Sequence, residues 1–286
     1  MTRRYARRDG EKRMNKQQLL VVGNGMVGHH FIEQLVNAGG LDTFAVTVLG
    51  AEPDSAYDRV HLSEVFGGRA PIELQMADPE WYAAQGVKLI LASAAEALDL
   101  AAKTVTTCHG EVYGYDQLVL ATGSYPFVPP IPGHTRAGCY VYRTLADLEA
   151  IRDACAGGRT GVVVGGGLLG LEAANALRLL GLETHVIEFA PRLMPVQLDA
   201  VGGDLLRSKI QSLGVQVHVN TATECIVDGE SARHRMVFKG GDYLETDVIL
   251  FSAGIRPEDR LARRAGLAIG ERGGIVIDNQ CRTSDA

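Results

Sequence analysis

The chain has 286 residues, of which 46% are hydrophobic and 22% are charged, and its formal net charge is −6 at pH 7. This composition is typical of a globular protein with a substantial core, and the length favours two domains. A net negative charge repels nucleic acid and anionic membranes, so we expect neither as a partner. No apolar run approaches the roughly 18 to 20 residues that a membrane-spanning helix needs, and we therefore expect a soluble chain.

The cysteines and the N-terminal segment indicate the cellular compartment in which we expect the protein. The five cysteines are far apart and include no Cys-x-x-Cys pair: Cys108, Cys139, Cys155, Cys225 and Cys281. Such a set encodes neither a zinc ribbon nor a vicinal redox disulfide, and it favours a reduced, cytoplasmic protein. Residues 1–16 are basic, lack the apolar segment of a secretory signal and contain acids that a transit peptide avoids. We interpret them as a disordered tail, with Met14 as an alternative start.

The first predicted elements along the chain form a β-α-β unit. Residues 19–22 are an apolar strand, residues 26–37 are a helix with one apolar face, and residues 44–49 are the second strand. The loop SAYDRVHLSEVFGG follows, and then a helix near residues 79–85. Further strand candidates are residues 87–92, 97–100, 103–107 and 117–121.

A proline-rich segment, residues 125–133, separates this region from the second half of the chain. Successive prolines fix φ and remove backbone donors, so we expect an extended connector rather than a sheet strand, and we place the domain crossover there. The second half repeats the β-α-β pattern. Its predicted elements are helices at 145–155, 168–180 and 199–213, strands at 160–164, 184–189 and 215–219, and a hairpin with a return strand across 237–250.

Both β-α-β units carry the pattern G-x-G-x-x-G between the first strand and the helix. The glycines are Gly23, Gly25 and Gly28 in the first copy and Gly165, Gly167 and Gly170 in the second. A dinucleotide pyrophosphate approaches the backbone at such a turn, where free N–H groups and the helix dipole favour an anion and a Cβ would interfere. One copy alone can be an ordinary tight turn, whereas two copies in this context predict two dinucleotide sites.

An acid at the end of the second strand usually binds the ribose hydroxyls. Glu188 stands there in the second copy, at the fingerprint spacing of roughly 20 residues, with a surface glutamate as the alternative. A carboxylate repels a 2′-phosphate, so we expect NADH to be preferred over NADPH, although Arg192 lies close enough in sequence to soften the preference. The first copy has Gly50 at this position. Glu52 is a ribose candidate there, or else a solvated turn residue.

Two dinucleotide sites on one chain suggest that a hydride moves from a nicotinamide to a second bound cofactor, which we expect to be a flavin. The hydride step needs no general acid or nucleophile, and we assign no catalytic residue. The eight histidines form no ligand pattern, because adjacent residues such as His29 and His30 diverge on a helix and cannot jointly hold a metal. We predict no metal site. We interpret His61 as a solvated or packed histidine, with a position near a flavin as the alternative.

The order of motifs resembles the two-dinucleotide-binding flavoprotein superfamily and, more narrowly, the amino-terminal FAD/NAD(P)-binding module of the large subunit of assimilatory NAD(P)H nitrite reductase. The motifs are GNGMVG, AEPDSAYDRVHLS, ATGSYPFVPPIPG, YRTLADLEAI, VVVGGGLLGLEAANAL, HVIEFAPRLMPVQLD, SAGIRP and GGIVIDNQCRTSD. The resemblance covers residues 19–285. It implies an α/β fold with two Rossmann-like domains, in which an NAD(P)H-binding domain at 141–260 is inserted into an incomplete FAD-binding domain formed by 17–140 and by 261–286.

The resemblance also implies contact residues for each cofactor. For FAD these are the first glycine turn with Met26, then Arg59, Ser63, Ala121, Thr122, Gly123 and Ser124; for the nicotinamide nucleotide they are the second turn with Leu168, then Glu188 and Gly254. Arginine suits a phosphate because its charge persists and its fork donates in pairs. The alternative for Arg59 is a loop cation exposed to water.

In the resembling enzymes NAD(P)H reduces FAD, and the electrons pass to an iron–sulfur cluster and sirohaem, where nitrite becomes ammonium. The clustered cysteines that hold those groups are absent from this sequence, which also stops before the segment that completes the FAD domain. We therefore expect a fragment that does not reduce nitrite alone. Its expected partners are the carboxy-terminal sirohaem and 4Fe-4S part, with a small subunit and a second copy of the chain as further candidates.

Two other functions stay open at this point. One is a stand-alone NADH-dependent reductase serving a rubredoxin or ferredoxin, and the other is a non-catalytic module that binds NADH without turnover. A disulfide reductase is disfavoured because the first domain lacks a cysteine pair. A peroxide or oxygen reductase is disfavoured because the YDRVHLSEVF region has no cysteine.

Overall fold

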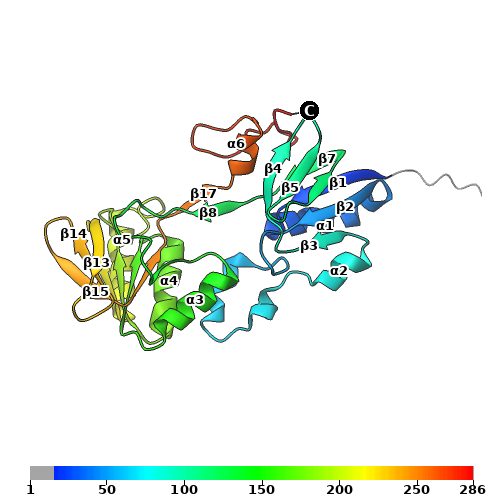
Figure 1. Cartoon of the computed structure of the whole chain (residues 1–286). Helices are drawn as coiled ribbons and strands as arrows, with labels where there is room; N and C mark the ends of the chain where they lie inside the picture. The colour runs from blue at the N-terminus through cyan, green and yellow to red at the C-terminus, as the bar shows by residue number, and fades with distance from the viewer. Residues whose placement is uncertain (1–15, 286) are drawn as a thin grey trace, which may run out of the picture. The chain divides into compact units, whose positions relative to one another are not determined.

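The computed structural model describes residues 16–285, which form two compact units (Figure 1). Unit 1 comprises residues 16–55 and 77–121, and unit 2 comprises residues 56–76 and 122–285. The basic tail predicted for residues 1–16 lies, up to residue 15, outside the described residues. Within residues 16–285, no helix combines the length and the apolar character that crossing a bilayer requires.

Unit 1 is built on a parallel four-stranded sheet with the order β3-β2-β1-β7. The strands are β1 (Gln17–Val22), β2 (Phe44–Leu49), β3 (Lys88–Ile90) and β7 (Gln117–Leu120), and the helices are α1 (Met26–Asn37) and α2 (Pro79–Ala84). Asp78 starts α2 because its Oδ1 accepts from the Trp81 N–H at 2.7 Å and Pro79 needs no donor partner in the first turn. A separate antiparallel sheet contains β4 (Ala95–Asp99), β5 (Thr104–Thr107) and β6 (Val112–Gly114).

Unit 2 contains a five-stranded parallel sheet with the order β12-β11-β10-β16-β9. Its strands are β9 (Cys139–Val141), β10 (Thr160–Val164), β11 (Glu183–Ile187), β12 (Val215–His218) and β16 (Val248–Phe251). Its long helices are α3 (Leu145–Cys155), α4 (Leu168–Leu179) and α5 (Ala200–Ser212). Alternate residues of each central strand serve two different cores, as expected for a parallel sheet buried on both faces.

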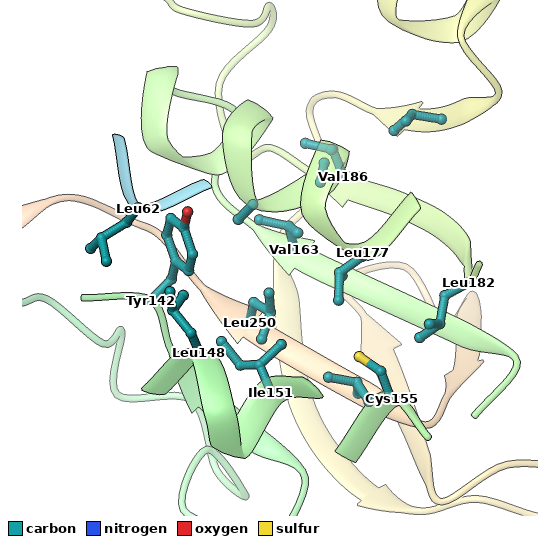
Figure 2. Packing of buried hydrophobic residues seen from close by; sticks show 14 of the residues in the cluster. Leu62, Tyr142, Leu148, Ile151, Cys155, Val163, Leu177, Leu182, Val186 and Leu250 are labelled. Atoms are coloured by element: carbon teal, nitrogen blue, oxygen red, sulfur yellow. The ribbon is translucent and has the colours of Figure 1, made fainter. Parts of the chain in front are cut away.

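The first core lies between this sheet and the helices. Figure 2 shows Leu148 and Ile151 of α3, Leu177 of α4, Val163 of β10 and Leu250 of β16 in one buried cluster. The other face packs on an antiparallel sheet of β13 (Thr223–Asp228), β14 (His234–Phe238) and β15 (Tyr243–Thr246). The second core contains Val162, Val164, Ile187, Ile226, Met236, Phe238, Ile249 and Phe251. Unit 2 therefore has helices, a parallel sheet and an antiparallel sheet as three layers.

The remaining elements of unit 2 are short. They are the 3-10 helices η2 (Arg59–Val65) and η3 (Pro71–Leu74), the strands β8 (Ser124–Pro126) and β17 (Ile255–Pro257), and the helix α6 (Arg260–Arg264); unit 1 adds the 3-10 helix η1 (Gly40–Asp42). The loop expected at residues 55–68 thus contains a helical segment, capped where Asp58 Oδ1 accepts from the Val60 N–H at 2.8 Å.

The two predicted β-α-β units are confirmed with bounds within a few residues. The expectation for residues 125–133 is wrong in one part, because β8 includes Tyr125 and Pro126 and pairs with β17. The pairing is possible because a two-stranded ribbon leaves one edge of each strand free, and proline can sit on that edge. The sequence pattern also missed β6, β9 and β13, which are short or lack clear alternation. The limits proposed for the two domains stay predictions.

Candidate functional site

Each β-α-β unit forms a tight corner at its glycine pattern. The first glycine of each corner has a left-handed backbone, with φ of 114° at Gly23 and 121° at Gly165. The third glycine packs against the first, because a Cβ at Gly28 would lie 2.0 Å from the Gly23 carbonyl oxygen, and one at Gly170 would lie 2.0 Å from that of Gly165. These positions keep the strand and helix close together and require glycine for that reason.

The middle glycines face open space instead. Gly25 and Gly167 are the N-caps of α1 and α4, with ordinary φ values of −86° and −82°, and a Cβ built on either meets no atom within 4 Å. Neither helix has a side-chain cap, so the N–H groups of the first turn, which begins at Met26 and Leu168, are available to an anion. Each corner therefore has both the room and the donors that fit a dinucleotide pyrophosphate.

The second corner opens into a cavity of about 660 Å³. This volume lies within the range of roughly 300–1,000 Å³ that small-molecule sites occupy. Five residues predicted for the nicotinamide nucleotide line the cavity: Gly165, Gly167, Leu168, Glu188 and Gly254. Gly254 has a φ of 106°, and its carbonyl oxygen accepts from the Phe127 N–H at 2.9 Å, which ties the end of β16 to the segment after β8.

Glu188 follows β11 and holds the glycine turn directly. Its Oε2 accepts from the Gly166 N–H at 2.6 Å and its Oε1 accepts from the Ala190 N–H at 2.7 Å. A Cβ on Gly166 would lie 3.0 Å from Oε2, so glycine there makes room for the carboxylate. Each carboxylate oxygen keeps a second lone pair for a ligand hydroxyl. The acid thus positions the turn and lines the cavity at the same time.

The basic residue that lines this cavity is not Arg192, which the sequence suggested. Arg192 donates from Nε to the Leu198 carbonyl at 2.9 Å and from its terminal NH2 to the Pro195 carbonyl at 3.2 Å, and its aliphatic part lies over Gly203. These contacts use Arg192 to shape the loop before α5, and it is not among the cavity-lining residues. Lys239, just after β14, does line the cavity, and no sequence pattern singled it out.

The first corner has a buried polar network in place of the acid. The Tyr82 hydroxyl donates to Asn24 Oδ1 at 2.8 Å and lies 2.8 Å from His29 Nδ1. Burial raises the pKa of Tyr82 to about 12 and lowers the pKa of His29. Asn24 Nδ2 is buried and has no hydrogen-bond partner within residues 16–285. Glu52 is half-buried two residues beyond Gly50. No sequence pattern marks Asn24 or Tyr82 as part of this corner.

The other residues predicted for FAD lie in both units. Ala121, in unit 1, is beside the first corner, because its N–H donates to the Val22 carbonyl at 2.8 Å. In unit 2, the Thr122 hydroxyl donates to the Glu258 carbonyl at 2.6 Å, and the Gly123 carbonyl, at a residue with φ of 71°, accepts from the Glu258 N–H at 2.9 Å. Ser124 Oγ accepts from Arg143 at 2.7 Å. Residues 122–124 are thus held by contacts within unit 2.

Arg59 and Ser63 lie on η2 in unit 2 and are half-buried. Arg59 donates to the Arg143 carbonyl at 3.1 Å, and its guanidinium carbon lies 4.7 Å from the centre of the Tyr57 ring. His61 Nδ1 is 2.6 Å from Asp58 Oδ2. No group of three His, Cys, Asp or Glu side chains in the described part of the chain is arranged to hold a metal ion.

Comparison with known proteins gives the family context. The chain is 54% identical over 272 residues to the nitrite reductase [NAD(P)H] large subunit of Klebsiella oxytoca and 49% identical over 273 residues to the nitrite reductase (NADH) large subunit of Escherichia coli. Each alignment covers 95% of this chain but only 28% and 32% of those relatives. The resemblance to nitrite reductase large subunits is therefore confirmed, over less than a third of the first relative.

A solved structure, that of a NAD-dependent persulfide reductase from A. fulgidus, superimposes with a TM-score of 0.87 at 30% identity and covers 94% of this chain and 51% of that one. The predicted α/β fold class is confirmed by this similarity and by the family pattern described as "Pyridine nucleotide-disulphide oxidoreductase", which matches residues 17–286. Membership of that family implies binding of FAD and NAD(P)H. The chain belongs to the pyridine nucleotide-disulphide oxidoreductase family.

Proposed function

We propose that this chain is the electron-input module of an assimilatory nitrite reductase, which passes a hydride from NAD(P)H to FAD. The observation that supports it most is the repeated corner, in which Gly25 and Gly167 both leave open space at an uncapped helix N-terminus. A bound flavin supplies the two-electron acceptor chemistry. The protein's part is to bind and orient, and the proposal assigns no catalytic residue.

Each corner has a proposed role that follows from its contacts. The turn at Gly167 and Leu168 binds the nicotinamide nucleotide's pyrophosphate, Glu188 accepts from its ribose hydroxyls, and Gly254 lies on the path of the nicotinamide. The turn at Gly25 and Met26 binds the FAD pyrophosphate.

The remaining proposed FAD contacts rest on the resemblance and lie in both units. They are Glu52, Arg59, Ser63 and the segment Ala121, Thr122, Gly123 and Ser124, which is held in place by the backbone contacts of Glu258. The Asn24 amide nitrogen, which lacks a partner within residues 16–285, adds a donor at the same corner. We propose that NADH is preferred over NADPH because Glu188 carries a negative charge where a 2′-phosphate would lie.

The wider assembly is also part of the proposal. The electrons would leave for a sirohaem and 4Fe-4S part that this sequence does not encode, in the cytoplasm, with a small subunit or a second copy of the chain as further partners. Nitrite is not a substrate of this chain alone.

The test is anaerobic reduction of FAD by NADH on the purified chain, followed by flavin absorbance, with ferricyanide as an artificial electron acceptor. We expect Gly167→Val to abolish NADH binding while retaining flavin, and Gly25→Val to reduce flavin retention while leaving NADH binding intact. NADH binding without reduction of either FAD or ferricyanide would contradict the proposal and favour a non-catalytic module. Efficient reduction of a rubredoxin or ferredoxin would favour the stand-alone reductase.

A further inference from the structure

A lysine side chain lines the cavity at the second corner, and the proposed function gives it no role. Lys239 lines this cavity together with Glu188, Gln197 and Thr221. Its side chain makes no hydrogen bond or ion pair within residues 16–285, in contrast to Arg192, which two carbonyl oxygens engage. Lys239 therefore keeps its donors for a ligand.

The strand order places Lys239 relative to the other cavity residues. The glycine turn follows β10, Glu188 follows β11, and the segment 219–222 follows β12, in a sheet whose order is β12-β11-β10. Because parallel strands end at the same edge, Glu188 lies between the turn and the segment 219–222. The Lys239 N–H donates to the Ala222 carbonyl at 2.9 Å, so Lys239 belongs to the β12 side.

Two backbone hydrogen bonds limit how far Glu188 and Lys239 can lie from each other. The Thr221 N–H donates to the Glu188 carbonyl at 3.0 Å, and the next residue, Ala222, is hydrogen-bonded to Lys239. Taking about 5.5 Å between Cα atoms of hydrogen-bonded neighbours and 3.8 Å between consecutive residues, the two Cα atoms are at most about 15 Å apart. Two long side chains that line one cavity bridge much of that separation.

A dinucleotide laid along this edge has its pyrophosphate at the turn and its adenosine ribose at Glu188. A group that projects from the ribose away from the pyrophosphate points toward β12. We propose that Lys239 binds the 2′-phosphate of NADPH there, and that Lys239 and Glu188 together set the choice between NADPH and NADH. This inference rests on the proposed function. The ammonium group offsets part of the repulsion from Glu188, so the site binds NADPH as well as the preferred NADH.

The test uses two small probes that differ only in the 2′-phosphate: adenosine 2′,5′-bisphosphate and adenosine 5′-monophosphate, each titrated calorimetrically into the FAD-supplied chain. We expect Lys239→Met to weaken binding of the bisphosphate by about tenfold and binding of the monophosphate by less than about twofold, because one charge-assisted contact is lost. Glu188→Gln should strengthen the bisphosphate relative to the monophosphate. Lys209→Met, which removes the same charge from α5 outside the cavity, should change neither.

The outcomes separate this inference from the proposed function. Equal weakening of both probes by Lys239→Met, or no weakening of either, would overturn the role of Lys239. Binding of the monophosphate without measurable binding of the bisphosphate by the unaltered chain would do the same while leaving the nucleotide site intact. Failure of the unaltered chain to bind the monophosphate, NADH and NADPH would instead contradict the proposed function.

Discussion

Two glycines of the second corner, Gly167 and Gly170, should respond in opposite ways to substitution by serine. In Gly170→Ser the new Cβ would lie 2.0 Å from the Gly165 carbonyl oxygen and 2.9 Å from its carbon. Nonbonded carbon and oxygen atoms approach to roughly 3.3 Å, so α4 or the turn must move by about 1 Å. No rotamer change relieves the contact, because the opposing atoms belong to the backbone.

The magnitudes predict a clear separation between these variants. Overpacking costs about 1–3 kcal/mol, and replacing a helical glycine by serine regains roughly 0.5 kcal/mol of helix propensity. We therefore expect Gly170→Ser to lower the free energy of unfolding by about 1–2 kcal/mol. At Gly167 the Cβ meets nothing within 4 Å and serine is a better N-cap than glycine, so stability should be unchanged or rise by a few tenths of a kcal/mol.

The variant that keeps its stability, Gly167→Ser, should be the one that loses affinity for NADH. The serine at Gly167 occupies space proposed for the pyrophosphate, so NADH affinity should fall by about tenfold or more in a variant that is as stable as the parent. Urea denaturation followed by circular dichroism gives the stabilities, and quenching of flavin fluorescence by NADH gives the affinities. If Gly170→Ser were as stable as the parent, or Gly167→Ser lost as much stability as Gly170→Ser, the assignment of packing to one glycine and ligand space to the other would be refuted.

Two further predictions concern buried polar groups. Tyr82→Phe removes the hydroxyl that joins Asn24 and His29, so we expect a loss of about 1–3 kcal/mol in the free energy of unfolding, and a denaturation midpoint equal to the parent's would exclude a structural role for the network. Burial lowers the pKa of His185 and of His218, whose rings lie 5.3 Å apart between centroids. Below about pH 6.5 the unfolded chain therefore binds more protons than the folded one, and the free energy of unfolding should fall as the pH drops through that value. In the His218→Gln variant this fall should be less steep, as measured by urea titrations at successive pH values.

The sequence predicted the two corners well because their determinants are local. The glycine pattern, the preceding strand and the following helix lie within about twenty residues, and Glu188 comes at a fixed spacing from Gly165. Lys239 and Tyr82 were missed for the opposite reason. Each reaches its corner through tertiary packing, Tyr82 from α2 and Lys239 from the antiparallel sheet, and neither has a local pattern that marks it.

The ribbon of β8 and β17 shows the limit of a local rule. Proline removes a donor, which correctly predicts that residues around Pro126 cannot lie in the middle of a sheet. The pairing with Ile255–Pro257 depends on a segment more than a hundred residues away in sequence, which no local pattern indicates.

The two corners differ in which of two facing positions, the turn or the strand end, carries a side chain, and this gives them different polar groups. In the second, glycine occupies the turn at position 166 and Glu188 fills the space at the strand end, where a Cβ on Gly166 would lie 3.1 Å from that of Glu188. In the first, Asn24 occupies the turn and Gly50 stands at the strand end, where a Cβ would lie 3.2 Å from that of Asn24. The same space is thus filled from opposite sides. Only the second arrangement presents a carboxylate at the strand end, while the first presents an amide, so we expect the proposed discrimination between ribose and 2′-phosphoribose at the second corner.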